Sequence, residues 1–454
     1  MKGDEIKLSL KHSLDLPISS TPKAKALVDR MKLLAMEVLL FLVILCPVAS
    51  VASSQTNSMK QGDVLNSSES TFLVSADKAF TLGFFTTERT QMSYLAVWLT
   101  GSLAGKRPIW IGNREAPLPV NSSPKLLIDA SGRLILTHNE SQGSPYPVSS
   151  KRTSRNVSAT LQDSGELVLR ERNADGSWGQ EVWSSFENPT DTLLLGMKLG
   201  VNHRTGRKWS VTSWLNGYSA APGAFSLEWE PIKRRLVIKY RGVAHWSSGE
   251  LKNTTHFHHL FFPKLQFLNI STKTEDYFTI APKPNRSDHI PYPLVALRLE
   301  PEGLVYDIIN GNLIIDTRKC YGYENRTQES IGCEVWEQPA CRDGAQTFEG
   351  NSGFFFNSTQ LGVAVPQNYT ALDSTDSPSD CREKCWKDCD CVGYLAYSKG
   401  CMYWRGTSLQ FQQDNTGLSA NVYVINRPIK EGDKNHKSSS SNSTKKWKRI
   451  VIPL

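Results

Sequence analysis

The chain has 454 residues, of which 39% are hydrophobic and 21% are charged, and a formal net charge of +8. This length is too great for a single hydrophobic core and predicts about three domains, while the composition is that of an ordinary globular protein. Much of the positive charge lies at the two ends of the chain, which argues against a nucleic-acid-binding face on a folded domain.

An apolar run from Val38 to Val51 follows Lys32 and closes with Ser50-Val51-Ala52. A charged start, a short apolar run and a small-x-small ending are typical of a secretory signal peptide. We therefore expect residues 1–52 to be an N-terminal extension followed by a signal peptide. Met31 or Met36 would be a better start, so residues 1–30 are read as an extension of the gene model.

Eleven Asn-x-Ser/Thr sequons follow this leader. One sequon is weak evidence, but eleven behind a leader predict passage through the secretory pathway and N-glycosylation. The acceptor residues are Asn66, Asn121, Asn139, Asn156, Asn253, Asn269, Asn285, Asn325, Asn357, Asn368 and Asn442. The expected location is therefore extracellular, either secreted or on the outer face of the plasma membrane.

Eight of the nine cysteines lie beyond residue 319, and the ninth, Cys46, lies in the leader. An even number in a secreted chain indicates disulfides. Zinc is disfavoured because the paired C-x2-C spacing of a structural zinc site is missing. The long region before the cysteines must be held together by packing alone.

Short apolar runs separated by Asp, Ser and Gly fill the chain from about residue 55 to residue 315. This pattern predicts an all-β sandwich, barrel or prism. Two segments repeat each other, Leu127–Leu136 and Leu161–Leu169, and Leu299–Tyr306 is a weaker third copy. Each copy reads as a glycine turn followed by an apolar strand, so we expect repeated hairpins in a pseudo-symmetric β-prism.

One helix is predicted near residues 378–388. Ser377 is a suitable N-cap, Pro378 suits the first helical position, and Asp380 completes a capping-box pattern. Cys381 and Cys385 would then share one face of the helix.

The chain becomes rich in Lys, Ser and Asn after Asn426, which is typical of a solvated linker. It closes with a basic cluster and Ile450-Val451-Ile452. Such a transition is typical of the start of a membrane-spanning helix, which needs about 20 apolar residues. We expect residues 428–454 to be a basic juxtamembrane linker and the start of a truncated transmembrane segment.

Several motifs resemble the extracellular half of plant S-domain receptor-like kinases, the G-type lectin receptors, and the related S-locus glycoproteins. The matching segments are Leu73–Ser75, Phe80–Phe85, Trp110–Arg114, Leu161–Leu169, Ser185–Leu194, Gly196–Gly200, Thr212–Trp214 and Pro222–Phe225. The resemblance covers roughly residues 55–427. It implies a mainly β architecture, with two tandem bulb-lectin-like β-prism domains followed by a small disulfide-rich α+β PAN/apple domain.

The resemblance also implies domain boundaries. We expect a bulb-type lectin domain at 53–185, a second lectin-like domain at 186–316, a short Cys-containing connector at 317–345 and a PAN/apple domain at 346–427. The connector stands where the family usually has an EGF-like module, which is missing or reduced here.

Mannose-binding bulb lectins use a Q-x-D-x-N-x-V-x-Y strand, whose polar groups hydrogen-bond the sugar hydroxyls. The corresponding residues of this chain are Gln162, Ser164, Glu166, Val168 and Arg170, of which Gln162 and Val168 match. Two readings follow. These residues form either a degenerate sugar pocket or a hairpin that serves strand packing, and the second is favoured.

By the resemblance to PAN/apple domains, Cys381 pairs with Cys401, and Cys385 with Cys391. The remaining cysteines suggest Cys320–Cys333 and Cys341–Cys389, although sequence alone does not fix connectivity.

The residues contain no Gly-rich phosphate loop, no His-Arg-Asp triplet and no Asp-Phe-Gly triplet. We therefore predict no enzymatic activity, cofactor or metal within this chain. The expected function is extracellular recognition of a protein, peptide or glycan, with receptor homo- or hetero-dimers as further partners and pollen recognition or defence as candidate roles. The alternatives are a secreted S-locus-glycoprotein-like binding or decoy protein, and a fragment of a receptor Ser/Thr kinase.

Overall fold

The computed structural model describes residues 56–426 with gaps. The gaps are residues 88, 102–107, 140–143, 151–152, 154–155, 253–255, 262–264, 284–294, 321–330, 335–338, 343–345, 358, 360–361, 365–366, 372–375, 397–399 and 415–420. The predicted leader, the basic tail with Asn442, and the sequons at Asn253, Asn285 and Asn325 lie outside the described residues. Among the residues that are described, no helix is both long and apolar enough to cross a membrane.

Residues 58–184, here called the first β region, form three antiparallel sheets. The first sheet has the order β1 (Ser58–Lys60), β11 (Val157–Leu161), β12 (Leu167–Arg172) and β13 (Trp178–Ser184). The second has the order β10 (Tyr146–Pro147), β9 (Leu134–Thr137), β8 (Lys125–Ile128) and β2 (Val64–Asn66). The third has the order β3 (Leu73–Val74), β4 (Phe80–Thr87), β5 (Met92–Leu99) and β6 (Pro108–Ile111), and β7 (Leu118–Pro119) also pairs with β5. Two short 3-10 turns, η1 (Ser67–Glu69) and η2 (Val120–Ser122), connect strands of this region.

Residues 192–316, the second β region, repeat this plan with three sheets of four strands. One sheet has the order β14 (Thr192–Leu194), β23 (Ala296–Leu299), β24 (Leu304–Asp307) and β25 (Asn312–Asp316). Another has the order β16 (Arg207–Trp209), β15 (Leu199–Asn202), β22 (Glu275–Pro282) and β21 (Leu265–Ser271). The last has the order β17 (Val211–Asn216), β18 (Ser219–Glu230), β19 (Arg235–Tyr240) and β20 (Val243–Ser247). The 3-10 turn η3 (Thr317–Cys320) follows β25.

Residues 347–426, the C-terminal region, combine one sheet with the helix α2 (Pro378–Lys387). The sheet order is β27 (Gly362–Val363), β26 (Thr347–Asn357), β32 (Asn421–Asn426), β29 (Cys391–Ala396), β30 (Gly400–Arg405) and β28 (Gln367–Ala371), and β31 (Leu409–Gln413) pairs with β26. The helix packs against β29 and β30 through Cys381, Cys385 and Trp386, which are all fully buried. Its observed bounds confirm the helix predicted near 378–388.

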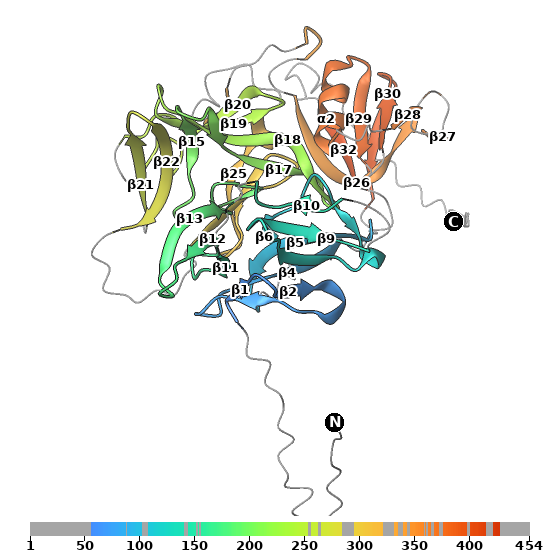
Figure 1. Cartoon of the computed structure of the whole chain (residues 1–454). Helices are drawn as coiled ribbons and strands as arrows, with labels where there is room; N and C mark the ends of the chain where they lie inside the picture. Colours follow the sequence, from blue (N-terminus) through green and yellow to red (C-terminus); the bar gives the residue numbers. More distant parts are fainter. Residues whose placement is uncertain are drawn as a thin grey trace, which may run out of the picture. The chain divides into compact units, whose positions relative to one another are not determined.

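A single hydrophobic cluster runs through both β regions. It takes apolar side chains from all three sheets of each, for example Leu82, Leu134 and Leu167 in the first, and Phe225 and Phe278 in the second. The C-terminal region has clusters of its own around Trp386 and Phe355. Figure 1 shows the first β region in blue to green, the second in green to yellow, and the C-terminal region in orange. The mainly β architecture with two tandem three-sheet prisms and a small α+β region is thus confirmed.

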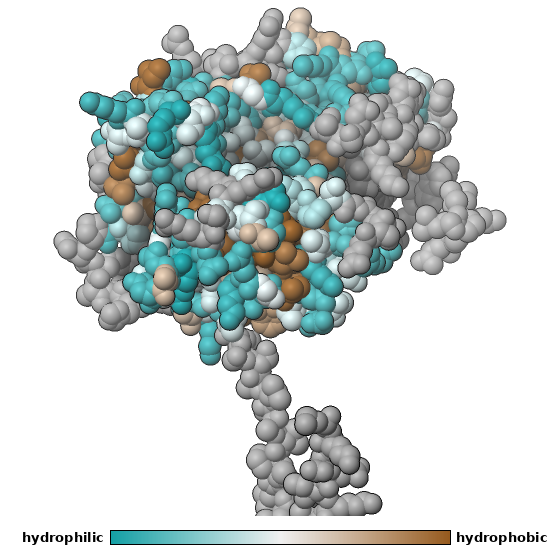
Figure 2. Space-filling view, in the orientation of Figure 1, coloured by the Kyte–Doolittle hydropathy of each residue, from teal (hydrophilic) through white to brown (hydrophobic). Residues whose placement is uncertain are grey.

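The outer surface of this fold is mostly polar. Figure 2 shows a largely hydrophilic face on which apolar residues appear in small separate areas. The few large apolar side chains that are well exposed include Ile232, Val243 and Phe261. Scattered apolar residues of this kind are normal on a folded protein, so specific binding has to be sought in pockets that combine polar and apolar groups.

Candidate functional site

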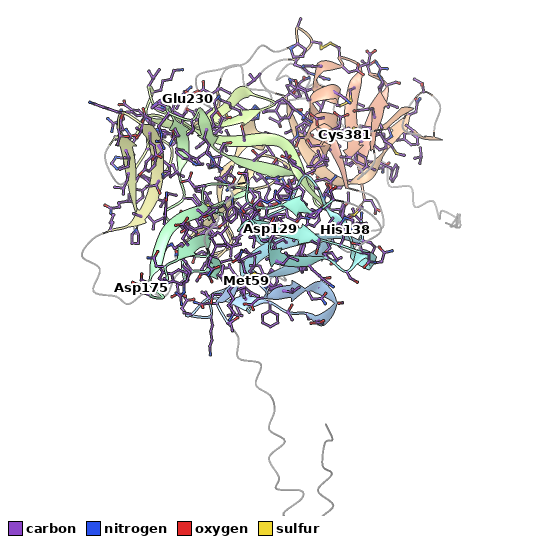
Figure 3. All side chains as sticks on the ribbon, in the orientation of Figure 1. Met59, Asp129, His138, Asp175, Glu230 and Cys381 are labelled. Atoms are coloured by element: carbon purple, nitrogen blue, oxygen red, sulfur yellow. A yellow bond between two sulfur atoms is a disulfide. The ribbon has the colours of Figure 1, made fainter. Side chains whose placement is uncertain are left out.

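The three repeated segments form hairpins with one shared hydrogen-bond pattern. In the copy that begins at Gln162, its N–H donates to Glu166 O at 2.9 Å, and Gly165 N–H donates to Gln162 O at 3.0 Å. The same two bonds recur at Asp129 in the first copy, which Figure 3 labels, and at Glu300 in the third. The turn glycines have φ between +71° and +84°, a left-handed conformation that favours glycine. The internal repeat predicted from the sequence is therefore confirmed.

The predicted sugar-binding residues lie in and beside the second of these hairpins. Gln162, Ser164 and Glu166 form the turn, while Val168 and Arg170 lie on β12. The Val168 side chain is 1% exposed and offers no surface to a sugar ring. Arg170 lies 3.5 Å from Glu181 on the neighbouring strand in an exposed ion pair.

The Glu166 carboxylate is also engaged by a neighbouring strand, because it accepts a hydrogen bond from the Ser184 hydroxyl at the end of β13. Burial raises the pKa of Glu166, and the Ser184 hydrogen bond only partly opposes this effect. One of its two oxygens is therefore already bonded by a protein donor, which reduces what the carboxylate can offer to a sugar hydroxyl. The geometry of this hairpin therefore favours a packing role over a sugar pocket.

Arg114, from the Trp110–Arg114 motif, joins the two β regions. Its guanidinium donates to the carbonyl oxygens of Ala220 at 2.8 Å, Ser213 at 2.8 Å and Thr212 at 3.1 Å. Burial lowers the pKa of Arg114, and the nearby Asp191 carboxylate opposes this shift. A guanidinium that bonds three carbonyl oxygens holds two segments in one geometry, so this motif is structural.

The Ser185–Leu194 motif lies at the same junction. The Trp110 indole N–H donates to Asn188 O at 2.9 Å, and the Trp209 indole N–H donates to Glu187 at 2.9 Å. Asp191 forms a buried ion pair with Arg298 on β23, with Nε and Oδ2 3.3 Å apart. The sequence marked this motif as characteristic of a family, and the structure shows that it joins the two β regions.

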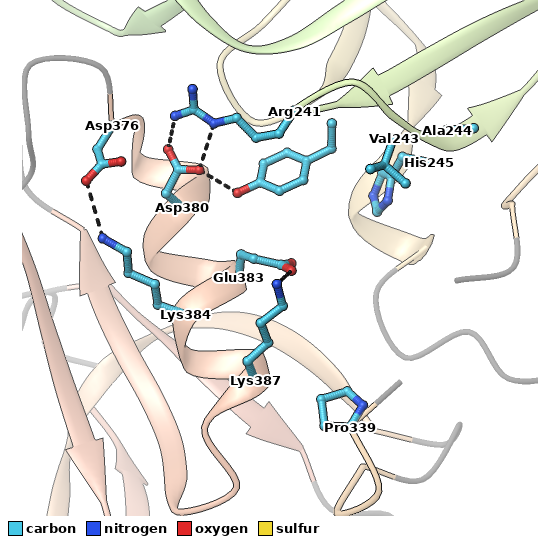
Figure 4. Close-up of a pocket in the computed structure, with 11 residues that line it drawn as sticks. Arg241, Val243, Ala244, His245, Pro339, Asp376, Asp380, Glu383, Lys384 and Lys387 are labelled. Atoms are coloured by element: carbon cyan, nitrogen blue, oxygen red, sulfur yellow. Dashed lines mark hydrogen bonds and ion pairs between the residues drawn. The ribbon is translucent and has the colours of Figure 1, made fainter. Parts of the chain in front are cut away.

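A pocket of about 750 Å³, here called the junction pocket, lies between the second β region and α2 (Figure 4). Arg241 and Tyr240, from the β19–β20 hairpin, both bond Asp380 in the first turn of α2. Two further ion pairs line the pocket, Lys384–Asp376 at 3.3 Å and Lys387–Glu383 at 2.9 Å. This volume is in the range of small-molecule sites, about 300–1,000 Å³.

His245 lies at the inner end of this pocket and is almost fully buried. Its Nε2 is 3.3 Å from the carbonyl oxygen of Thr317, so this nitrogen carries the proton. Burial lowers the pKa of His245 to about 4, an effect that the Thr317 hydrogen bond opposes and the positive charge of Arg382 reinforces. The ring is therefore neutral at ordinary pH. Sequence reasoning found neither His245 nor the Arg241–Asp380 pair.

Four disulfides staple the C-terminal half: Cys320–Cys333, Cys341–Cys389, Cys381–Cys401 and Cys385–Cys391. These pairs coincide with the expected ones. Beside them, the buried Arg342 donates to the carbonyl oxygens of Cys385 and Trp386, each at 3.0 Å. These oxygens lie at the C-terminal end of α2, where carbonyl groups lack intrahelical partners. Arg342 therefore acts as a buried cap for the helix.

The described sequons differ in exposure. Asn121, Asn139 and Asn156 are exposed, whereas Asn66, Asn269 and Asn357 are partly buried. Asn368 lies on β28. The Asn66 side chain is already engaged, because it accepts from Ser68 N–H at 3.2 Å and donates to Glu69 at 2.9 Å. The exposed acceptors are thus the ones most open to a glycosylating enzyme.

Comparison with known proteins supports this architecture. A family model described as D-mannose binding lectin matches residues 108–215, and one described as a PAN-like domain matches residues 349–410. The first match runs from the first β region into the second. Among solved structures, a two-domain fetuin-binding lectin of Scilla campanulata covers 57% of this chain and 86% of its own, with 12% identity. Its TM-score of 0.20 is too low to support an argument.

The curated relatives are receptor-like kinases and a glycoprotein. A G-type lectin S-receptor-like serine/threonine-protein kinase of Arabidopsis thaliana is 32% identical over 362 residues, covering 77% of this chain and 41% of the relative. A second such kinase of that plant is 30% identical over 389 residues, covering 77% and 44%. The S-locus-specific glycoprotein S6 of Brassica oleracea is 32% identical over 203 residues, which is 44% of each chain.

The chain thus spans less than half the length of these relatives. The region aligned with the kinases is their lectin and PAN-containing part, and neither matching family model is that of a kinase domain. The chain therefore belongs to the family of lectin- and PAN-containing ectodomains shared by G-type lectin S-receptor-like kinases and S-locus glycoproteins.

Proposed function

We propose that this chain is a ligand-recognition module exposed outside the cell, the extracellular region of a lectin-type receptor-like kinase. The single observation that carries the proposal is the alignment of 77% of this chain with 41% of a receptor-like kinase. A kinase domain supplied by the rest of such a protein would convert ligand binding into phosphorylation. The chain described here contributes recognition.

The proposed division into domains follows the sheets. A bulb-type lectin domain at 53–185 contains the first β region, a lectin-like domain at 186–316 contains the second, and a PAN/apple domain at 346–427 contains the C-terminal region. The connector at 317–345 carries the Cys320–Cys333 disulfide. Polar contacts across these boundaries, such as those of Arg114 and Arg241, support rigid presentation of the pockets between domains.

The similarity to the S-locus-specific glycoprotein S6 favours a second candidate, a secreted binding or decoy protein without signalling. Both candidates require a folded extracellular module that binds a protein, peptide or glycan. They differ in whether a membrane anchor and a kinase are joined to it.

The test is to express the chain in a secretory host and to confirm glycosylation by its mobility shift after deglycosylation. The oxidised protein is then applied to a glycan array containing mannose and mannan, and to a peptide array. Dose-dependent binding to either array supports the proposed function. A well-folded, secreted protein that binds neither class contradicts it. Loss of glycan binding on Gln162→Ala, with no change in stability, would assign the binding to the hairpin after all.

A further inference from the structure

A second pocket, here called the crevice, lies between the two β regions. Its volume is about 390 Å³, which is in the range of small-ligand sites. Phe85 and Thr86 come from β4 of the first β region, while Trp214 and Asn216 come from the end of β17 in the second. The turn that connects β17 and β18 adds Tyr218.

The buried ion pair of Asp191 and Arg298 lines the inner part of the crevice. Both side chains are almost fully buried, and both are bonded further: Arg298 to Pro108 O, and Asp191 to the Thr190 hydroxyl at 3.2 Å. A charge pair held in this way gives the crevice a polar inner surface without a net charge. The opposite wall is formed by the β17–β18 segment. It is held by the hydrogen bonds from the Arg114 guanidinium to the carbonyl oxygens of Ser213 and Ala220, here called the Arg114 clasp.

The walls supply aromatic rings and one oriented amide. The rings of Phe85 and Trp214 lie 6.4 Å apart, and the Arg89 guanidinium lies 4.1 Å above the Tyr218 ring. The Asn216 oxygen accepts from the N–H groups of Tyr218 and Ser219, each at 2.9 Å, which fixes the amide. Among the described residues nothing accepts a hydrogen bond from the Asn216 NH₂ group, so its donors are available to a ligand.

The charges around the crevice balance. Its lining has two cations, Arg89 and Arg298, and two anions, Asp191 and Glu300. Such a site does not select a charged peptide or an anion. Rings that can cover an apolar C–H face, together with a fixed amide, the exposed Thr86 and the Tyr218 hydroxyl, match a ligand rich in hydroxyl groups.

We propose that the crevice binds a neutral saccharide, at a position separate from the repeated hairpins. This inference rests on the proposed recognition function and specifies its ligand class. A neighbouring pocket of about 480 Å³ shares Arg89, Asn216, Gly217 and Tyr218 with the crevice. A ligand longer than one sugar ring extends past this turn into the neighbouring pocket, which Tyr394 and Tyr423 of the C-terminal region also line.

A large side chain in place of Gly217 would block ligand binding in the crevice and leave the junction pocket, which this residue does not line, unchanged. Gly217 lines the crevice, and a Cβ added at this exposed turn residue meets no atom within 4 Å, so a phenylalanine there adds bulk beside the crevice without a clash at its Cβ. Gly217→Phe is therefore the test variant. Val243→Phe is the matched control, because Val243 is 63% exposed in the junction pocket and does not line the crevice.

The experiment uses the full secreted chain and measures binding of neutral disaccharides, including mannobiose and cellobiose, by saturation-transfer NMR and calorimetry. We expect wild type, Val243→Phe and Gln162→Ala to bind alike, and Gly217→Phe to bind at least about tenfold more weakly with an unchanged melting temperature. Tyr218→Ala, which removes one ring, should also weaken binding.

Three results would overturn the inference. Binding that survives Gly217→Phe but is lost on Gln162→Ala would place the saccharide at the hairpin. Binding of peptides with no binding of any saccharide would contradict the ligand class while leaving the proposed recognition function intact. A folded protein that binds neither class would contradict both.

Discussion

Arg241 and Asp380 form a two-point ion pair between the β19–β20 turn and the first turn of α2. Arg241 Nε donates to Oδ1 at 3.1 Å, and its Nη2 donates to Oδ2 at 2.5 Å. Asp380 also accepts from the Tyr240 hydroxyl and from the N–H of the N-cap residue Ser377. Burial alone would raise the pKa of Asp380, but the hydrogen bonds from Arg241 and Tyr240 outweigh it and lower that pKa. One carboxylate thus caps a helix and joins the second β region to the C-terminal region.

Arg241→Met should destabilise this junction, because it leaves the Asp380 carboxylate, whose side chain is 10% exposed, with an uncompensated charge. Arg241 itself is 39% exposed, so we expect a loss of about 1–3 kcal/mol, less than for a fully buried pair. Urea unfolding followed by tryptophan fluorescence measures the change. Lys252→Met is the control, because both partners of its ion pair with Glu250 are more than half exposed, and it should change stability by less than about 0.5 kcal/mol. Equal losses in the two variants would contradict the structural role of the pair.

His245 should make stability depend on pH. Its pKa falls from 6.5 to about 4 on folding because of burial, so between these values the unfolded chain binds more protons than the folded one. The stability from neutral His245 is fully present above pH 6.5 and is lost as the pH falls towards 4, about 3 kcal/mol in total.

The measurement is urea unfolding of wild type and His245→Phe at several pH values between 4 and 7. The groups near the ring include the Arg382 charge, the Tyr240 and Phe225 rings and the Thr317 carbonyl, and the variant leaves all four in place. The variant loses a hydrogen bond at every pH, so its absolute stability is lower, but its curve should be flatter across this window. Parallel curves for the two proteins would rule out His245 as the titrating group.

Glu166→Gln tests the interpretation that the Gln162–Arg170 hairpin serves packing and does not need the Glu166 charge. Because burial raises the pKa of Glu166, the folded state disfavours the charged form, and this cost grows as the pH rises through the folded pKa. Glutamine keeps an oxygen to accept the Ser184 hydrogen bond but carries no charge. We expect the variant to melt at a higher temperature than wild type at pH 7, with the difference shrinking as the pH falls through the raised pKa of Glu166 towards 4.5 and changing no further below that pH. A lower melting temperature at pH 7 would show that the charge itself is needed.

Local features of the fold were predictable from the sequence. The glycine turns and the Ser377–Asp380 cap depend on residues a few positions apart, so the pattern of residue types is enough to find them. The junctions were not predictable in this way. Arg241 and Asp380 are 139 residues apart, and Arg114 bonds backbone oxygens about 100 residues away, which leave no trace in residue type. Which arginine contacts which segment depends on the tertiary packing of segments that are distant in sequence.

In the candidate site, too, local features were predictable from the sequence and long-range contacts were not. Gln162 and Glu166 could be found because the strand motif of mannose-binding bulb lectins aligns with them, but the Ser184 hydrogen bond of Glu166 depends on a neighbouring strand. The crevice has no linear motif, since its residues come from segments around 85, 216 and 298. Asp191 did lie within a motif that marked the family, yet nothing local indicated that it pairs with Arg298.

Arg114→Lys tests whether the clasp depends on guanidinium geometry rather than on charge. A lysine ammonium is a single point donor group and does not span the oxygens of Thr212, Ser213 and Ala220 as the planar fork does. Buried carbonyl groups left without donors are costly, so we expect a loss of about 2–4 kcal/mol in urea unfolding.

Arg207→Lys is the matched control for this change. Arg207 is exposed and bonds one side-chain oxygen, that of Asn188, at 2.7 Å, which lysine can also reach. It should cost less than about 0.5 kcal/mol. Because the Arg114 clasp also holds one wall of the crevice, Arg114→Lys should weaken disaccharide binding under conditions where the protein remains folded, whereas Arg207→Lys should not. Wild-type stability in Arg114→Lys would mean that charge alone holds the two β regions together.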